Sequence, residues 1–291
     1  MIAAYALMCL IWGTTWLGIK VSLHYVAPAT GAGMRFILAG LIVYAFAAAR
    51  GKLVAPRALP WKLVGVLASC LFGINYILTY LAETHVSSGL TAVLFGVLPF
   101  FMFGFGHYLL GERTAGMTWA GAAIAFTGVC VISLETGTHG SFWYVLAVVG
   151  AALSSAFANV YAKRHSHNDP LATLPPSMLL AGAAVFIFGL LTEPFDPARA
   201  FSAGSCIAIL YLAIAGSAVA FFLNLWLLKR VRAWIVGMSA LIIPVIAVAV
   251  GILFGGEHFG VQEGAGAALV IAGVFFALRA DARPQAEKLP A

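Results

Sequence analysis

Two segments of the chain repeat one pattern of proline, glycine and glutamate at a constant offset of 145 residues. In the first segment Pro99 is followed thirteen positions later by Glu112, and in the second Pro244 is followed at the same distance by Glu257. Matching glycine and valine residues keep the same register further on. An internal repeat of this length points to two structurally similar halves, which restricts the fold more than any other feature of the sequence.

The composition indicates that both halves lie in lipid. Hydrophobic residues make up 63% of the chain and charged residues 9%, which leaves too few polar side chains to cover a water-soluble surface. A membrane helix needs roughly 20 mainly apolar residues to cross a hydrocarbon core of about 30 Å. Ten such stretches are present, at residues 2–21, 31–49, 62–82, 89–110, 115–134, 142–162, 171–191, 204–228, 234–254 and 261–279.

These stretches predict an all-α integral membrane protein with ten transmembrane helices. The repeat divides the helices into two groups of five, residues 1–136 and 140–280, followed by a tail at 281–291. Because five is odd, the second group enters the membrane from the opposite side, and the two groups form inverted repeats.

The basic residues predict the orientation, because Lys and Arg near helix ends stay on the cytoplasmic side. With both termini in the cytoplasm, the opposite face keeps only Arg199 outside the expected spans. The net charge of +6 then reflects topology and attraction to anionic lipid heads, and no nucleic-acid partner is expected. The residues expected on the cytoplasmic side are Arg50, Lys52, Arg57, Lys62, Arg113, Lys163, Arg164, Lys229, Arg230, Arg232, Arg279, Arg283 and Lys288.

Cysteines and histidines give no sign of a metal centre. The four cysteines fall in four different expected spans, and the seven histidines lie mostly at helix ends without the spacing of a zinc site. We therefore assign no metal and no cofactor.

Polar residues at membrane depth usually face the interior of a helix bundle or a water-filled cavity. In the first expected span Trp12, Trp16 and Lys20 recur every four residues and share one helix face. In the third span an aromatic stripe ends on Glu83, with amide and hydroxyl side chains beside it. The members of this stripe and its polar neighbours are Phe72, Tyr76, Tyr80, Asn75 and Thr79.

Such stripes would suit a flat, partly apolar ligand, and we expect these residues to bind the substrate. The alternative is that each aromatic side chain only packs against neighbouring helices. Ser155, Asn159 and Asn224 supply polar groups in the second half. They either line the same cavity or hydrogen-bond between helices.

Lys20, Arg35 and Glu83 form a candidate charge cluster, because Lys20 and Arg35 are the cations placed inside the expected spans. The cluster either holds the first three helices together or provides a cation for a substrate carboxylate.

Pro99 and Pro244 lie within equivalent spans, where proline removes a helical hydrogen bond and kinks the helix. Matching kinks could serve a gating motion, although a kink that only serves packing is the alternative. The dipeptides at 111–112 and 256–257, both Gly-Glu, are interpreted as helix caps on opposite sides of the membrane.

The ordered set of these features resembles the EamA-type branch of the drug/metabolite transporter superfamily over essentially the whole chain. The matching elements are Trp12-Gly13 with Lys20, Arg35-Phe36, and the proline, Gly-Glu and glycine-valine elements of both repeats. The resemblance implies ten helices in two inverted repeats. Within the superfamily the chain looks like the bacterial inner-membrane exporters of aromatic amino acids, which implies export through a central cavity. The second half departs from the pattern, with Ser154 near the place of the Trp-Gly pair and Ser177 opposite Arg35.

We expect a secondary transporter that moves aromatic and other apolar amino acids, or related metabolites, by alternating access in a lipid bilayer. Carriage of a drug, nucleotide sugar or purine-like metabolite, or a passive channel, are the alternatives. An intramembrane enzyme is not expected, because the chain has neither an H-E-x-x-H motif nor paired intramembrane aspartates. The acidic residues lie at the ends of the expected spans, so uncoupled movement and antiport both fit the sequence.

Overall fold

The computed structural model describes residues 1–85, 91, 94–133, 142–246 and 261–282. Regular structure in this part of the chain is helical, and the expectation of an all-helical membrane protein is confirmed. Six helical segments there are long and apolar enough to cross a membrane: Ile2–Leu23, Pro28–Ala49, Trp61–Glu83, Phe142–Arg164, Pro170–Thr192 and Ala203–Leu228. Shorter apolar helices occupy Leu98–Leu110, Ala233–Ile246 and Gly264–Ala280.

The helical elements of the first half include α1 (Ile2–Leu23), α2 (Pro28–Ala49), η1 (Pro56–Ala58), α3 (Trp61–Val66), η2 (Leu67–Ile74), α4 (Asn75–Glu83), α6 (Leu98–Leu110) and α7 (Gly116–Ser133). The second half contains α8 (Phe142–Arg164), α9 (Pro170–Thr192), α10 (Pro197–Ala200), α11 (Ala203–Ala213), η3 (Ile214–Val219), α12 (Ala220–Leu228), α13 (Ala233–Gly237) and α15 (Val261–Ala282). The predicted division at residues 136–140 falls outside the described residues and stays a prediction, as does the tail from residue 283 onward.

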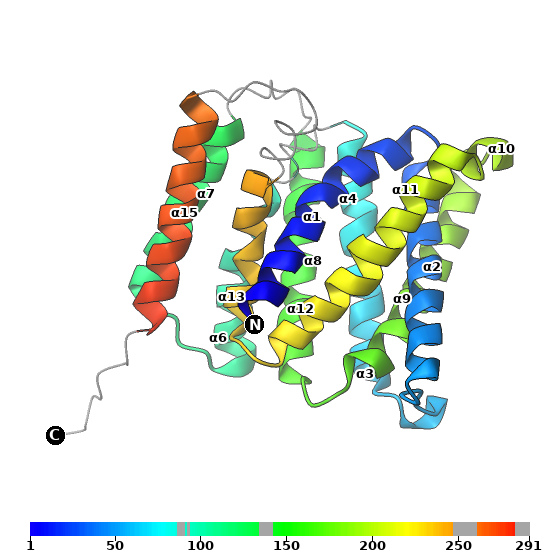
Figure 1. The fold of residues 1–291 in the computed structure, drawn as a ribbon, viewed down its shortest axis with the longest axis horizontal. Coiled ribbons are helices and arrows are strands. Elements are labelled where there is room, and N and C mark those ends of the chain that lie inside the picture. Colours follow the sequence, from blue (N-terminus) through cyan, green and yellow to red (C-terminus); the bar gives the residue numbers. More distant parts are fainter. Residues whose placement is uncertain (86–90, 92–93, 134–141, 247–260, 283–291) are drawn as a thin grey trace.

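Helices α2 and α9 pack along each other through a seam of glycines at one side of the molecule (Figure 1). A Cβ atom on Gly33 would lie 2.5 Å from the backbone of Phe186, and one on Gly182 would lie 2.6 Å from the backbone nitrogen of Ile37. Positions rise along α2 as they fall along α9, so the two helices are antiparallel. Small residues let the two backbones approach this closely, which is the usual means of helix association in lipid.

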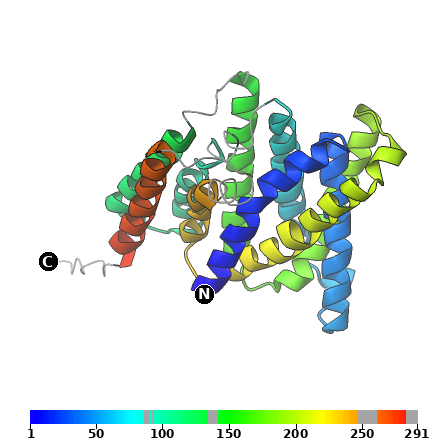
Figure 2. The same ribbon diagram turned by 45° about the horizontal axis from the view of Figure 1, so that its top comes forward.

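A second glycine seam joins α7 and α15, which lie side by side at the opposite side of the molecule in both views (Figures 1 and 2). A Cβ atom on Gly121 would lie 2.6 Å from the backbone nitrogen of Ala277, and one on Gly273 would lie 2.4 Å from that of Ala125. These two helices are also antiparallel, because positions rise along α7 as they fall along α15.

Two long helices contain π-helical segments, η2 between α3 and α4 and η3 between α11 and α12. A π-helical turn disturbs the regular hydrogen-bond ladder, so polar side chains of neighbouring helices can bond to its carbonyls. Ser154 of α8 donates to the Cys70 carbonyl of η2 at 2.8 Å, and Trp12 of α1 donates through Nε1 to the Gly216 carbonyl of η3 at 3.4 Å. Each half therefore contacts the irregular segment of the other.

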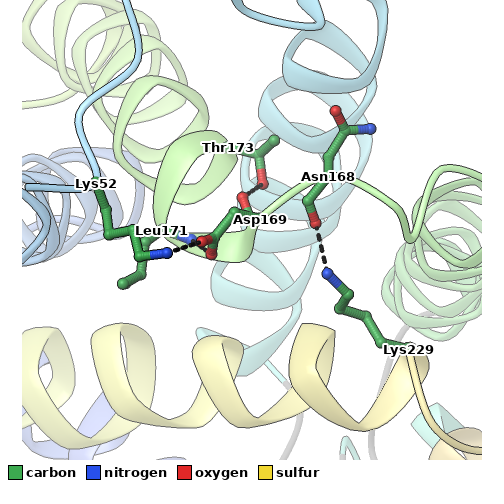
Figure 3. A network of polar contacts seen from close by, with 6 residues as sticks. All are labelled: Lys52, Asn168, Asp169, Leu171, Thr173 and Lys229. Atoms are coloured by element: carbon green, nitrogen blue, oxygen red, sulfur yellow. Dashed lines mark hydrogen bonds and ion pairs between the residues drawn. The ribbon is translucent and has the colours of Figure 1, made fainter.

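The two ends of the α2–α9 pair are joined by charged side chains. At one end Glu193, after α9, accepts hydrogen bonds from the backbone nitrogens of Ala29 and Thr30 at 2.8 and 2.9 Å, and so caps α2. At the other end Lys52, after α2, forms a 3.6 Å ion pair with Asp169, the N-cap residue of α9 (Figure 3).

The same end of the bundle is tied to the α12–α13 connection. Figure 3 shows Lys229 reaching the carbonyl oxygen of Asn168, to which its Nζ donates at 3.1 Å. Lys163 likewise donates to the carbonyl of Val231 at 2.8 Å. These contacts fix the loops at this end against one another.

Candidate binding pocket

An internal pocket lies between the two halves, with residues from α1, α4, α6, α8, α12 and α13 in its wall. Its volume is about 80 Å³, and a buried water needs roughly 10–15 Å³ on this measure, so the pocket has room for a small organic molecule. The lining residues are Trp12, Thr15, Trp16, Ile19, Asn75, Tyr76, Thr79, Phe95, Leu98, Met102, Ser155, Asn159, Phe221, Asn224, Val236, Gly237, Ser239, Ala240 and Ile243.

Aromatic rings form one part of the wall. Trp12 meets Phe221 edge to face with ring centroids 5.4 Å apart, and Trp16 meets Phe95 in the same way at 6.1 Å. The ring centroids of Tyr76 and Phe221 are 6.2 Å apart. Edge-to-face contacts hold the rings at fixed angles, so the apolar surface offered to a ligand is well defined.

Amide and hydroxyl side chains form another part of the wall. Asn224 of α12 donates through Nδ2 to Oδ1 of Asn159 in α8 at 2.7 Å. Asn159 in turn donates to the backbone carbonyl of Ser155 at 2.8 Å and to its hydroxyl at 3.3 Å. Across the pocket wall Asn75 donates to the Leu71 carbonyl, and its Oδ1 accepts from Thr79.

Of the ten residues expected from the sequence to bind substrate, eight line this pocket. They are Trp12, Trp16, Asn75, Tyr76, Thr79, Ser155, Asn159 and Asn224. Phe72 and Tyr80 do not line it, because both are fully buried. Phe72 packs against Phe36 and Phe221, and Tyr80 belongs to a core cluster with Ile19 and Ala29.

Arg35 lies behind the aromatic wall and is fully buried. Its Nε donates to the Ser217 hydroxyl at 2.7 Å, and its Nη2 donates to the Gly216 carbonyl at 3.0 Å and, more weakly, to the Tyr76 hydroxyl at 3.4 Å. The guanidinium carbon lies 4.8 Å from the centre of the Tyr76 ring. Arg35 thus joins α4 of the first half to η3 of the second.

The three residues of the predicted charge cluster, Lys20, Arg35 and Glu83, do not form ion pairs with one another in the described part of the chain. Lys20 is exposed, whereas Glu83 is buried and neither of its carboxylate oxygens has a hydrogen-bond partner. Neutral groups satisfy the Arg35 guanidinium.

Helical regularity is interrupted before each of the two prolines expected to act in gating. Pro99 lies in the first turn of α6, after a turn at residues 96–97, and Pro244 lies in a helical stretch at 239–246 after a turn at Met238. Gly111 ends α6 in the left-handed conformation with φ 66°, as expected for a cap. Glu112 accepts a hydrogen bond from the backbone nitrogen of Ala233 at 3.5 Å, at the start of α13, and the pair at 256–257 lies outside the described residues.

Eleven lining residues were not among those expected. Most are apolar, such as Phe95, Phe221 and Ile243, and only their distribution over several helices marks them as pocket residues. Thr15 and Ser239 are the polar members of this group. Thr15 lies beside the Trp12–Trp16 face and could have been included, whereas the sequence around Ser239 is otherwise apolar.

A bundle of membrane-length helices around an internal, largely apolar pocket with a few polar groups defines a membrane transport protein for a small molecule. The pattern of the EamA-like transporter family matches residues 1–134 and again residues 142–279. The chain belongs to this family, as the sequence comparison with the drug/metabolite transporter superfamily predicted.

Several bacterial proteins are similar over most of their length. "Uncharacterized inner membrane transporter YedA" of Escherichia coli K12 is 29% identical over 250 residues, which cover 85% of this chain and 80% of that protein. "Protein PagO" of Salmonella typhimurium is 30% identical, with 84% and 81% covered. A "Probable amino-acid metabolite efflux pump" of Salmonella typhimurium is 26% identical, with 92% and 91% covered.

A solved crystal structure shares the fold. It superposes with a TM-score of 0.83 over 96% of both chains at 21% identity. The arrangement of helices around the pocket is therefore that of a known fold.

Proposed function

We propose that the protein is a secondary transporter that exports aromatic and other apolar amino acids, or closely related metabolites, across the bacterial inner membrane by alternating access. The observation that carries the proposal is the composition of the pocket wall, where Trp12, Trp16, Tyr76 and Phe221 face the same space as an asparagine–serine network. A ligand with an aromatic ring and a compact polar end matches both parts. Similarity to a probable amino-acid metabolite efflux pump supports the same substrate class.

The paired antiparallel helices support the transport mechanism. Helix α2 lies against α9 and α7 against α15, and two antiparallel pairs of this kind are what two inverted five-helix repeats would produce. The pocket lies between the halves, where rocking of one against the other would expose it to each side in turn. Ten spans, with repeats at 1–136 and 140–280 and both termini cytoplasmic, complete the proposed topology.

Counterflow in liposomes tests the function directly. Purified protein is reconstituted into liposomes loaded with unlabelled L-phenylalanine, and uptake of radiolabelled L-phenylalanine is measured against a competition panel of all twenty amino acids. Saturable counterflow that aromatic and large apolar amino acids inhibit best is expected. Uptake that neither saturates nor shows counterflow would identify a passive channel, and competition by none of the amino acids would exclude this substrate class.

Two tyrosines provide a matched pair of variants. Tyr76 lines the pocket, whereas Tyr108 on α6 is 85% exposed. Tyr76→Ala should lower phenylalanine counterflow several-fold, since an aromatic contact contributes about 0.5–1.5 kcal/mol beyond area burial, and Tyr108→Ala should not. Equal activity of the two variants would remove Tyr76 from the substrate path.

Labelling of single cysteines tests the topology. Thr114→Cys and Gly260→Cys, each in a background without the four native cysteines, should react with a membrane-impermeant maleimide from opposite sides of the membrane. Reaction from the same side would contradict the inverted-repeat arrangement.

A further inference from the structure

Two polar side-chain groups that the second half contributes to the pocket wall have no hydrogen-bond partner among the described residues. One is Oδ1 of Asn224, since within the described part of the chain that side chain makes a single hydrogen bond, the one that Nδ2 donates to Asn159. The other is the hydroxyl of Ser239. A polar group out of bulk water without a partner is unfavourable, so both groups are available to a ligand.

The orientation of the Asn224 amide follows from a relay of hydrogen bonds. The backbone carbonyl of Ser155 can only accept, so Asn159 must turn Nδ2 toward it, at 2.8 Å. Oδ1 of Asn159 then faces Asn224. Because this oxygen can only accept, Asn224 donates to it through Nδ2, with 2.7 Å between the two atoms. Oδ1 of Asn224 is consequently directed away from Asn159, and an acceptor is fixed at this point of the wall.

The charge of the wall limits which ligands can use this acceptor. None of the described residues that line the pocket is charged, and Arg35 lies behind Tyr76 with its guanidinium fully buried. A ligand with a net charge would lose its hydration without meeting a countercharge, which is strongly unfavourable in a semi-dry site. A zwitterion has no net charge, and each of its ends can bond to a neutral dipole.

We infer that Oδ1 of Asn224 accepts a hydrogen bond from the ammonium group of a zwitterionic, net-neutral substrate. Asn159 acts as a positioning residue that fixes the acceptor, and the Ser239 hydroxyl is a free donor for the oxygen atoms of the same ligand. The inference rests on the proposed amino-acid transport, and it adds the charge class of the substrate and the group that recognises its amine.

Ligand binding to the wild-type protein is the first test. The dissociation constants of L-phenylalanine, phenethylamine and 3-phenylpropionate are measured by tryptophan fluorescence in detergent. These ligands share one ring and differ in carrying both charges, only the cation or only the anion. Phenylalanine should bind at least about tenfold more tightly than either analogue, because each analogue lacks one of the two charged groups that hydrogen-bond to the wall.

The Asn224→Asp variant is the second test, because it changes the charge of the acceptor at nearly constant shape. The negative wall should then favour phenethylamine, and the ratio of its affinity to that of phenylalanine should rise by about tenfold or more. Asn168→Asp is the matched control, since Asn168 lies in the loop before α9, outside the pocket wall, and its variant should leave the ratio unchanged. Asn159→Leu should raise KM for phenylalanine with little change in maximal rate.

The outcomes separate the inference from the proposed function. If wild-type protein shows phenylalanine counterflow but binds phenethylamine or phenylpropionate equally well, the requirement for a net-neutral ligand is wrong. An unchanged ratio in folded Asn224→Asp protein would remove Asn224 from amine recognition. If this variant does not fold, the wild-type ligand series still decides the charge class. Absence of both binding and counterflow for every amino acid would instead contradict the proposed function.

Discussion

A single methyl group added to Gly33 tests whether close backbone contact holds α2 against α9. The new Cβ atom would lie 2.5 Å from the backbone nitrogen and Cα of Phe186, and backbone atoms move away only if the helices separate. Overpacking of this kind costs about 1–3 kcal/mol. Alanine also has a higher helix propensity than glycine by roughly 1 kcal/mol. The control must therefore be another glycine-to-alanine substitution within a helix.

Gly104 in α6 provides this control, because a Cβ atom there would meet nothing within 4 Å. Gly104→Ala should be neutral or stabilising by about 0.5–1 kcal/mol. The two variants should therefore differ in the free energy of unfolding by about 1–3 kcal/mol. One kcal/mol moves Tm by roughly 2–4 °C in a chain of 150–250 residues, so a difference of several degrees is expected.

Thermal unfolding in detergent measures this difference in a background without Cys70, Cys130 and Cys206, where a thiol-reactive dye reports the exposure of the buried Cys9. A second methyl group at Gly182, which faces Ile37 across the same seam, should add less than its separate effect, because the first has already parted the helices. If Gly33→Ala unfolds at the same temperature as Gly104→Ala or above it, the seam does not depend on glycine and the reasoning is refuted.

Two further predictions concern contacts between the halves, and a third concerns the two prolines expected to act in gating. Glu193→Ala should lower Tm more than Glu193→Gln, because glutamine can still accept from the α2 N-terminus; equal shifts would contradict a capping role. Trp12→Phe keeps a ring in the pocket but loses the bond to the Gly216 carbonyl, and transport should fall by about fivefold, as for a bond of roughly 1 kcal/mol; wild-type rates would refute it. Pro99→Ala and Pro244→Ala should each slow counterflow while phenylalanine affinity persists, and wild-type rates in both would assign the prolines to packing.

Helix positions were predictable from the sequence because the length of an apolar stretch is a local property. The stretch expected at 142–162 is observed as Phe142–Arg164, and that at 171–191 as Pro170–Thr192. The π-helical segments η2 and η3 were not predictable, because the apolar pattern runs through them without a break. Their carbonyls bond to side chains from other helices, and that information is not present in the local sequence.

Residue spacing in the third span predicted which face of the helix is directed toward the pocket. It did not predict which turns of that face line the pocket. Tyr76 and Tyr80 lie one turn apart, and both bond to Arg35. Tyr76 lines the pocket, while Tyr80 is fully buried in a core cluster with Ala29 and Val185. Glu112 shows the same limit: the sequence indicated a helix cap at residues 111–112, but not that Glu112 accepts a hydrogen bond from the backbone nitrogen of Ala233 at the start of α13. Contacts between distant helices decide both outcomes.

The two halves carry different side chains at the positions where the sequence pattern was broken, and one of these residues, Trp12, lines the pocket. Trp12 and Ser154 both donate to a carbonyl of the π-helical segment in the opposite half, so the contact is kept while the side chain changes from large to small. Arg35 and Ser177 likewise both donate to a carbonyl in the opposite half.

The first half contributes four aromatic side chains to the pocket, Trp12, Trp16, Tyr76 and Phe95, together with the polar Thr15, Asn75 and Thr79. The second half contributes one aromatic side chain, Phe221, and the polar Ser155, Asn159, Asn224 and Ser239. A fully symmetric dimer of repeats would present the same chemistry from both sides. Asymmetry at a few positions instead makes the first half the richer in aromatic rings and the second half the richer in small polar groups, and this uneven distribution can orient a ligand that has one ring and one polar group.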